Sequence, residues 1–270
     1  MYQRAEIAGI RERKENTQLS LRDAVAILSI VIAGAVILKM FFVDAIHVPS
    51  QSMEGTLLDG DYVLVNKLIY GATTPRRIPF TNTGVPFVRL PGVRSVERGD
   101  VIVFELPEPV SSSGSPTYFV KRCVAIAGDE LQLRDGNLRV NGVEIGTRTF
   151  TGKSASRSQD FGPIRVPRSG DVLELNDAAS RIWQDVVVKD GHRISSGHSS
   201  EILIDGHPAT SYKVEQDYLF VVGDNADHSY DSRHWGLLPE ENVLGKAMVV
   251  YWSVSPSSTT RWERVGKIVE

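Results

Sequence analysis

The sequence predicts a mostly β protein: an antiparallel β domain that carries an inserted α/β subdomain and is anchored by one N-terminal transmembrane helix. Three features of the 270 residues support this prediction. A single long apolar run lies near the start. Beyond it, short runs rich in β-branched and aromatic residues alternate with Gly-Asp, Asp-Gly and Asn-Gly pairs, as strands alternate with tight turns. A later stretch has weaker periodicity and many Ser, Arg and Lys residues.

Composition excludes several classes of protein. With 41% hydrophobic and 23% charged residues, the chain can bury one large core or two smaller ones, so it is not a disordered protein. A net charge of −3 and the lack of any basic run give no general attraction for nucleic acid, and we expect no nucleic-acid partner. The single cysteine, Cys123, excludes an intramolecular disulfide and a cysteine-based zinc cluster. We interpret it as a small buried hydrophobe and expect no metal or cofactor.

The apolar run from Ala24 to Val43 is interrupted only by Ser29 and Lys39. A helix of about 20 residues spans roughly 30 Å, the thickness of a bilayer core. We therefore assign residues 23–43 to a transmembrane helix. A cleaved signal peptide is one alternative, but its apolar region usually has about 7–15 residues and ends at an Ala-x-Ala-like site. A buried core helix is the other alternative.

The charges on either side of this helix predict its orientation. Residues 1–22 form a short polar tail, and after the helix no basic residue occurs before Lys67. The basic residues on the N-terminal side are Arg4, Arg11, Arg13, Lys14 and Arg22. By the positive-inside rule, the tail is cytoplasmic and everything after Asp44 lies across the membrane.

Beyond the helix, several runs have the alternation of short β-strands. Gly-Asp pairs precede three of them, and Asp-Gly and Asn-Gly pairs separate three shorter apolar segments, which predicts a meander of hairpins. Strands joined by turns predict an antiparallel sheet. The longer runs are Tyr62–Asn66, Val101–Glu105, Tyr118–Ile126, Val172–Leu175 and Tyr218–Val222, and the hairpin segments centre on Leu131/Leu133, Leu138/Val140 and Val143/Ile145.

One helix is predicted in the second half of the chain. Asn176 is a plausible N-cap for a helix from Asp177 to about Val188, and Gly191 lies beyond its end. Periodicity is weakest over 146–214. We therefore assign 134–214 to the inserted subdomain, and 44–133 with 215–270 to the main β domain. Residues 71–95 and 107–116 are predicted loops.

Two serines lie at a predicted turn soon after the apolar run. Pro49 fixes its own φ and biases the preceding residue toward an extended backbone, while glycines such as Gly55 punctuate the other side. Ser50 and Ser52 should therefore lie on a short, stiff, partly exposed segment. Such a segment can hold the side chain of a nucleophile in a fixed position. An ordinary serine-rich turn is the alternative.

A second candidate residue is Lys121, within the predicted strand Tyr118–Ile126. Alternation places it on the same face as Phe119 and Cys123, with Arg122 facing the other way. A lysine among apolar side chains loses hydration, which lowers its pKa toward the range in which it acts as a neutral base. The alternative is a solvated Lys-Arg pair at a strand edge.

The densest polar cluster of the chain spans residues 221–236 and predicts a turn rich in side-chain-to-backbone hydrogen bonds. A calcium loop is one interpretation, although the glycine and glutamate spacing of an EF-hand is missing. A Ser-His-Asp triad that uses His228 or His234 is another. The third is a structural turn in which Asp231 and Arg233 form an ion pair.

Together these segments resemble the bacterial type I signal peptidases, also called leader peptidases, a family with a Ser-Lys dyad. The motifs cover most of the chain outside 146–214. Lysine at position 121 separates the sequence from the members of the endoplasmic reticulum, which have histidine there. The motifs are Ser50-Gln-Ser-Met53, Arg98-Gly-Asp-Val-Ile-Val-Phe104, Lys121-Arg122 ahead of Gly128-Asp129, Gly223-Asp-Asn-x-x-x-Ser-x-Asp-Ser-Arg-x-Trp-Gly236, and Arg261-Trp-x-Arg-Val265.

The resemblance implies a membrane-anchored serine endopeptidase, a hydrolase. By that resemblance Ser52 is the nucleophile and Lys121 the general base, and the oxyanion hole consists of the Ser50 hydroxyl and the Ser52 backbone N–H. A serine hydroxyl needs such a base, and the oxyanion needs preorganised donors. The supporting residues would be Ser229, which holds the lysine in place, and Arg122, Asp231 and Arg233.

The resemblance also implies the substrate and the location. The partners would be signal peptides of exported preproteins, bound as extended strands and cut after small residues at the first and third positions before the scissile bond, and membrane lipid. The location would be the cell inner membrane, crossed once, with the N-terminus cytoplasmic and the catalytic domain extracytoplasmic. The inserted subdomain would be non-catalytic.

Three positions depart from the family pattern. Gly55 stands where proline is usual, Ala226 where arginine or lysine is usual, and Ala127 where proline is frequent. Gly55 is expected to leave the loop after Ser52 less rigid. Two other functions stay open: a self-cleaving Ser-Lys protease of the repressor kind, whose members carry a DNA-binding domain instead of a membrane helix, and an anchored β domain that binds export substrates without cutting them.

Overall fold

The structure is a computed structural model that describes residues 20–73, 88–106, 118–135, 137–145, 160–175, 180–197 and 201–270. The chain divides into two compact units, Met1–Leu38 and Lys39–Glu270. Several sequence predictions lie outside the described residues, namely most of the tail 1–22, residues 74–87 of the predicted loop 71–95, the loop 107–116, the turn residue Gly136 and the helix start at Asn176 and Asp177.

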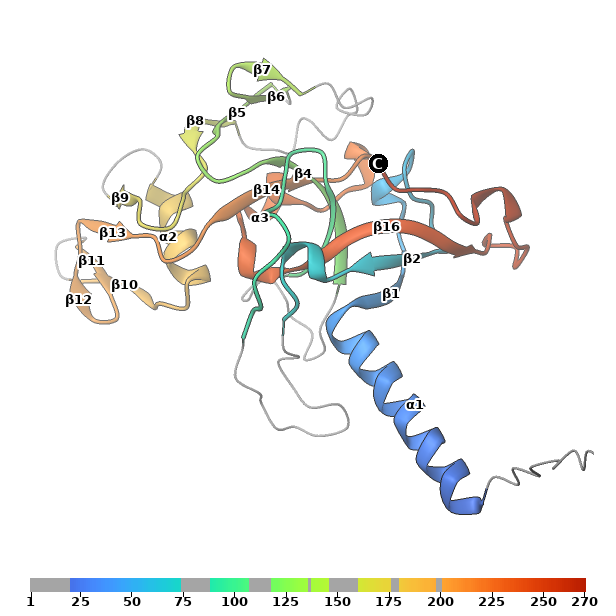
Figure 1. Cartoon of the computed structure of the whole chain (residues 1–270). Helices are drawn as coiled ribbons and strands as arrows, with labels where there is room; N and C mark the ends of the chain where they lie inside the picture. Colours follow the sequence, from blue (N-terminus) through green and yellow to red (C-terminus); the bar gives the residue numbers. More distant parts are fainter. Residues whose placement is uncertain are drawn as a thin grey trace, which may run out of the picture. The chain divides into compact units, whose positions relative to one another are not determined.

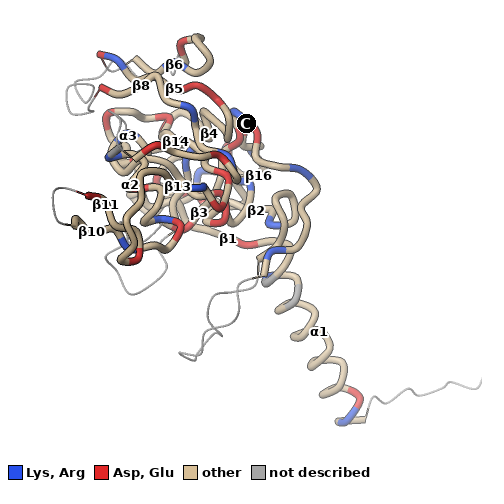
Figure 2. The backbone as a smooth tube through the Cα atoms, turned by 90° about the vertical axis from the view of Figure 1, so that its left-hand side faces the viewer, with Lys and Arg blue, Asp and Glu red and all other residues tan. Residues whose placement is uncertain are grey.

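Helix α1 spans Leu21–Phe41. Ser20 and Asp23 cap its start reciprocally, each accepting a hydrogen bond from the backbone N–H of the other at 3.2 Å. Figure 2 shows most of its length without charged residues. The helix ends at Phe41, slightly before the predicted end, because Val43 begins the first strand. Among the helices of the described residues, none combines the length and apolarity needed to cross a membrane. The transmembrane assignment of 23–43 stays a prediction.

The main sheet of the second unit has seven strands in the order β1-β2-β16-β3-β4-β14-β15, and every pair is antiparallel (Figure 1). This confirms the antiparallel prediction. The 11-residue strand β16 lies between β2 and β3. The sequence analysis predicted neither β16 nor the edge strand β1. The strands are β1 (Val43–His47), β2 (Asp61–Asn66), β3 (Val101–Glu105), β4 (Tyr118–Ala125), β14 (Tyr218–Val222), β15 (Leu238–Pro239) and β16 (Val243–Ser253).

The predicted meander is a four-stranded sheet in the order β7-β6-β5-β8. The turn residues Asp135 and Asn141 both have φ of 51°, which favours the short polar residues that the sequence places there. The hairpin prediction is thus confirmed, and the fourth strand, β8, is an addition. The strands are β5 (Glu130–Arg134), β6 (Asn137–Val140), β7 (Val143–Glu144) and β8 (Phe161–Arg165).

Helix α2 spans Ser180–Lys189, which matches the predicted helix except that it ends one residue later, and Gly191 beyond its end has φ of 95°. Around it lie two small sheets, a pair of strands and a three-stranded meander (Figure 1). Their strands are β9 (Val172–Glu174) with β13 (Ser211–Lys213), and β10 (Ile194–Ser196), β11 (Ile202–Ile204) and β12 (His207–Pro208). The other short helices of the described residues are η1 (Gln51–Met53), η2 (Leu68–Tyr70), η5 (Ala226–His228), α3 (Ser232–Trp235), η6 (Glu240–Asn242) and η7 (Trp262–Arg264).

One hydrophobic cluster joins the predicted insertion to the main sheet. Val124 of β4 and Phe220 of β14 belong to the same buried cluster as Leu173 of β9 and Val187 of α2. Burial of each such side chain contributes about 1.5–3 kcal/mol. The strands that approach the candidate site are therefore supported from the side of the insertion. The domain limits at 134 and 214 stay a prediction.

Candidate active site

Ser52 lies on the short helix η1, which follows the edge strand β1. Ser50 has an extended backbone, with φ of −145°, and is exposed, as predicted for this segment. Ser52 itself is 5% exposed, and the next residue, Met53, is fully buried and packs in the core. The turn therefore presents the Ser52 hydroxyl toward the interior, where a partner can desolvate it.

Lys121 of β4 is that partner. Its Nζ lies 2.6 Å from Ser52 Oγ, although the two residues are 69 positions apart. Lys121 is 3% exposed, and its Nζ lies 5.9 Å from the ring centre of Phe119, its neighbour on the same face of the strand. Burial lowers the pKa of Lys121 to about 8, against the opposing charges of Asp231 and Asp224. The predicted desolvation of this lysine is confirmed.

A second hydroxyl lies next to the pair. Ser50 Oγ is 3.2 Å from Ser52 Oγ, and either oxygen can donate. Residues 50 and 52 belong to the same turn, since Ser50 is the N-cap of η1 and Ser52 lies within it. The Ser50 hydroxyl is thus placed to donate to an oxyanion that forms beside Ser52.

Gly223, just after β14, allows the polar turn to approach this pair. A Cβ at this position would lie 2.3 Å from Ser229 Oγ and 2.4 Å from the Ser52 carbonyl oxygen, so only glycine fits. The N–H of Asn225 donates to the same carbonyl at 3.0 Å. Ser229 Oγ is buried, and no described residue forms a hydrogen bond with it. A buried hydroxyl therefore remains available close to Ser52.

Asp231 and Arg233 form a buried ion pair behind the polar turn. Two guanidinium nitrogens of Arg233 donate to the two carboxylate oxygens of Asp231, each at 2.8 Å. Burial alone would raise the pKa of Asp231, but hydrogen bonds with His234 and Arg233 hold it well below the usual range. Asp231 also caps helix α3 and accepts a hydrogen bond from the N–H of Gly223 at 3.0 Å. The pair thus fixes the backbone that carries Gly223.

Arg122 joins the serine loop to the polar turn. Its guanidinium donates to both oxygens of Asp224, at 2.8 and 2.7 Å, and to Thr56 Oγ1 at 3.0 Å. Thr56 Oγ1 donates in turn to Asp224 at 2.6 Å. The sequence analysis named Arg122 as a supporting residue but did not single out Thr56 or Asp224 as its partners. Thr56 and Asp224 are 168 positions apart, so their hydrogen bond gives no local pattern that the sequence analysis could detect.

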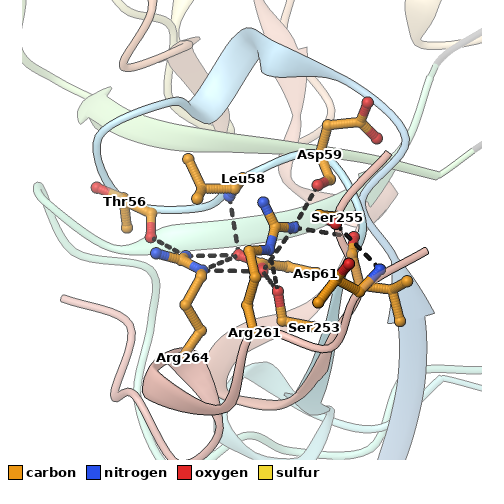
Figure 3. A network of polar contacts seen from close by, with 10 residues as sticks. Thr56, Leu58, Asp59, Asp61, Ser253, Ser255, Arg261 and Arg264 are labelled. Carbon is orange, nitrogen blue, oxygen red and sulfur yellow. Dashed lines mark hydrogen bonds and ion pairs between the residues drawn. The ribbon is translucent and has the colours of Figure 1, made fainter. Parts of the chain in front are cut away.

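A second polar network contacts the same loop (Figure 3). Asp61 is fully buried and accepts hydrogen bonds from Arg264, from Ser253 Oγ at 2.6 Å and from the N–H of Leu58 at 2.8 Å. Arg261 donates to Ser253 Oγ at 2.8 Å. The arginines of the motif near the end of the chain therefore stabilise the loop that follows Ser52.

Gly55 lies in this loop with φ of 108°, and nothing lies within 4 Å of the position of a Cβ. Proline, which is usual at this place in the resembling family, is restricted to φ near −65°. The loop thus takes a backbone course here that proline cannot take.

The two histidines of the polar turn have other partners than Ser52. His228 Nδ1 lies 3.4 Å from Asn225 Oδ1, and His234 Nδ1 accepts a hydrogen bond from the N–H of Asp231 at 3.4 Å. In the part of the chain that the structure describes, no group of three or more His, Cys, Asp or Glu side chains is arranged to hold a metal ion. The ionisable group that forms a hydrogen bond with Ser52 Oγ in the described residues is the amine of Lys121.

Fold and site together define a class of protein: an antiparallel β protein in which a buried lysine contacts a buried serine hydroxyl. Comparison with known proteins gives the family. Residues 21–252 match the family model described as "Signal peptidase, peptidase S26". The chain therefore belongs to the signal peptidase family, peptidase S26, and is a peptidase, a hydrolase.

Two relatives can be aligned with this chain over most of their length. Signal peptidase I of Aquifex aeolicus (strain VF5) is 29% identical over 256 residues, which cover 89% of this chain and 88% of that protein. Signal peptidase I of Helicobacter pylori (strain J99 / ATCC 700824) is 27% identical over 276 residues, which cover 87% of this chain and 89% of that protein.

Proposed function

We propose that the protein cleaves the signal peptides of exported preproteins with a catalytic Ser-Lys dyad, Ser52 and Lys121. The observation that carries the proposal is the 2.6 Å separation of Lys121 Nζ from Ser52 Oγ at a lysine whose pKa is lowered to about 8. A serine hydroxyl is a weak nucleophile until a base takes its proton, and a lysine can be that base only when it is neutral. Desolvation supplies the neutral form near physiological pH.

In the proposed mechanism, Ser52 Oγ attacks the scissile carbonyl carbon while its proton passes to Lys121 Nζ. The oxyanion accepts hydrogen bonds from the Ser50 hydroxyl and the Ser52 backbone N–H, each such donor contributing about 10²–10³ in rate. Collapse of the tetrahedral intermediate expels the new N-terminal amine, which takes the proton from Lys121. Water then attacks the acyl-enzyme with Lys121 again as base, which releases the signal peptide and restores Ser52.

The remaining site residues are proposed to position this pair. Ser229 is proposed to hold the lysine, supported by its buried hydroxyl beside the position of Gly223. The ion pair of Asp231 with Arg233 supports the turn that carries Ser229, and Arg122 supports the serine loop. None of these residues is proposed to contact the reacting atoms directly. Their effect on catalysis is proposed to act through the positions of Ser52 and Lys121.

The substrate is proposed to bind as an extended strand, with small side chains at the first and third positions before the cut. Support comes from the position of Ser52, five residues after the edge strand β1, since extended peptides add to sheet edges through main-chain hydrogen bonds. The names of the relatives, signal peptidase I, agree with this substrate class.

The proposed location is the cell inner membrane, crossed once by residues 23–43, with the N-terminus cytoplasmic and the catalytic domain extracytoplasmic. The apolar run and the basic residues before it support this proposal. The test is extraction of membranes with alkaline carbonate and protease treatment of intact spheroplasts. Retention in the membrane and digestion of the catalytic domain from outside are expected, whereas release by carbonate would overturn the proposal.

The function itself is tested by cleavage of a preprotein whose signal ends in Ala-x-Ala, in detergent, by the wild-type protein and by the Ser52→Ala and Lys121→Ala variants. Wild type should cut after the second alanine, and each variant should lose about 10⁴-fold or more in kcat while keeping its fold. Folded wild-type protein that binds the preprotein without cutting it would favour a binding module. Efficient cleavage by Lys121→Ala would assign the base elsewhere, with His228 and His234 tested next.

A further inference from the structure

A second buried lysine lies at the end of helix α2, in the predicted insertion. The side chain of Lys189 is 0% exposed. Its Nζ donates to Asp185 Oδ2 at 2.6 Å, to the carbonyl of Trp235 at 2.7 Å and to the carbonyl of Leu237 at 2.9 Å. All three hydrogens of the ammonium group therefore have acceptors, one of which belongs to the last residue of helix α3 and another to the segment that follows it.

These contacts fix the C-terminal end of α3. The last carbonyls of a helix lack partners within the helix, and Lys189 satisfies that of Trp235. The chain then reverses at Gly236, whose φ is 83°. A Cβ at Gly236 would lie 2.9 Å from Asp185 Oδ2 and 3.4 Å from Lys189 Nζ. Helix α2 thus packs directly against the reversal and leaves α3 little room to shift.

The other end of α3 reaches the active site. Its N-cap, Asp231, accepts a hydrogen bond from the N–H of Gly223, the residue that lies against Ser52 and Ser229. Ser232 Oγ accepts a hydrogen bond from the N–H of Val221 at 3.1 Å. Since α3 has only four residues, a displacement at one end moves the other. Ser229 lies two residues before the N-cap and would move with it.

Helix α2 is itself held by the strands of the site. Val186 and Val187 are buried in the same cluster as Val124 of β4. The hydroxyl of Tyr218, at the start of β14, donates to Asp190 Oδ1 at 2.6 Å and contacts the carbonyl of Val186 at 3.0 Å. Strand β14 pairs with β4, which carries Lys121. One helix therefore contacts both the strands behind Lys121 and the segment behind Ser229.

We propose that Lys189 is a positioning residue of the peptidase: through the carbonyls of Trp235 and Leu237 it sets the position of α3, and so the place of Ser229 and Gly223 beside the Ser52–Lys121 pair. This inference rests on the proposed function. It gives the insertion a role in catalysis without contact with the substrate.

The experiment compares Lys189→Met with Val187→Ala in the full-length protein in detergent. Val187 is fully buried on the same helix, but it belongs to a different hydrophobic cluster from Trp235 of α3, so its variant loses core packing and none of the hydrogen bonds that Lys189 makes. Three quantities are measured at a temperature where both variants are folded: kcat and KM for the Ala-x-Ala preprotein, the pH midpoint of kcat, and amide hydrogen exchange at Gly223 and Asn225. The milder variant Asp185→Asn is measured as well, in case Lys189→Met does not fold.

For Lys189→Met we expect about a tenfold fall in kcat with KM unchanged, a shifted pH midpoint, and faster exchange at both amides. Asp185→Asn should change the same quantities in the same direction by less, and Val187→Ala should leave all of them unchanged. If folded Lys189→Met keeps the kcat and pH midpoint of Val187→Ala, the lysine is only structural and the inference is wrong. If wild type does not cleave at all but the exchange difference persists, the proposed function fails while the placement of α3 by Lys189 stands.

Discussion

Two regions of this molecule are each built around a buried lysine, and they differ in what the amine contacts. Lys121 faces one hydroxyl, and no carboxylate of the described residues lies within ion-pair distance of it. Lys189 faces a carboxylate and two backbone carbonyls. Burial lowers the pKa of both, but Asp185 opposes this effect at Lys189 through direct contact, whereas the charges that oppose it at Lys121 act from further away.

The difference indicates that burial alone does not determine whether a lysine is easily deprotonated; the partners of its amine matter as well. An ammonium group with acceptors for all its hydrogens is a stable structural cation, while one with a single hydroxyl partner loses its proton readily. In our proposals, the two regions thus use the same side chain in two ways: Lys121 as a base, and Lys189 as a residue that holds α3 in place. The following predictions test this contrast.

The largest effect is expected for Lys121→Met, which should lower kcat by about 10⁴-fold or more, since it removes the proposed base that contacts Ser52 Oγ. The same variant should raise the free energy of unfolding by about 1–3 kcal/mol at pH 7, because it removes a poorly compensated buried amine. Lys189→Met should instead lower the free energy of unfolding by about 2–4 kcal/mol, because it leaves buried acceptors unpaired. Urea unfolding of wild type, Lys121→Met and Lys189→Met measures the two changes in the free energy of unfolding. If both changes have the same sign, the contrast between the two lysines is wrong.

The stability gain of Lys121→Met should also depend on pH. The pKa of Lys121 is about 8 in the folded protein and 10.5 as the unperturbed value, so the unfolded chain binds more protons between these values. Wild-type stability should therefore rise through this interval, and the advantage of the variant should be complete below pH 8 and fade toward pH 10.5. An advantage independent of pH would show that methionine acts through packing.

Gly223→Ala should disturb the site of Lys121 directly and that of Lys189 only indirectly, through α3. The new methyl group would overlap Ser229 Oγ and the Ser52 carbonyl, so we expect kcat to fall by about 10²-fold through misplacement of the nucleophile. The contacts of Lys189 involve none of these atoms. Cleavage kinetics and circular dichroism test this. Unchanged kcat in the folded variant would show that the polar turn can move away from Ser52 without loss of activity.

The pH dependence of the wild-type rate should follow Lys121. In the proposed mechanism the neutral amine is the active form, so kcat should rise with pH, about tenfold per unit well below pH 8, and level off above it. Rates measured from pH 5.5 to 10 in one buffer series test this. A rate that levels off near pH 6.5 would point to a histidine as the base instead.

The smallest effect is expected for Asp185→Asn, which keeps the shape of the side chain and removes its charge. Because Asp185 is partly exposed, its pairing with Lys189 is screened by solvent, and the free energy of unfolding should fall by only about 1 kcal/mol. Urea unfolding at low and high salt measures it. A loss as large as that of Lys189→Met would mean that the carboxylate, and not the two carbonyls, is the main partner of the lysine.

Much of the site was predictable because its signals are local. The serine turn, the lysine on a β-strand and the polar turn each have a recognisable sequence, and the hairpins have turn pairs such as Asn141-Gly142. The rest depends on long-range pairing. The alternation of β16 is obscured by its register shifts and by polar residues such as Lys246, and it was not predicted. Lys189 looks like an ordinary basic residue at a helix end, because the carbonyls that it binds lie 46 and 48 positions away.

The position of β16 in the main sheet has a consequence for the timing of assembly. β2, which follows the serine loop, has β16 as its inner neighbour, and Asp61 at its start bonds with Arg264, 203 residues later in the chain. Pairings of such sequence separation form late, because a long loop must close first. While the ribosome is still making the middle of the protein, Ser52 and Lys121 are both present, yet the strand that frames them does not exist. We therefore expect a nascent chain to be inert toward the proteins that emerge beside it until synthesis has passed β16.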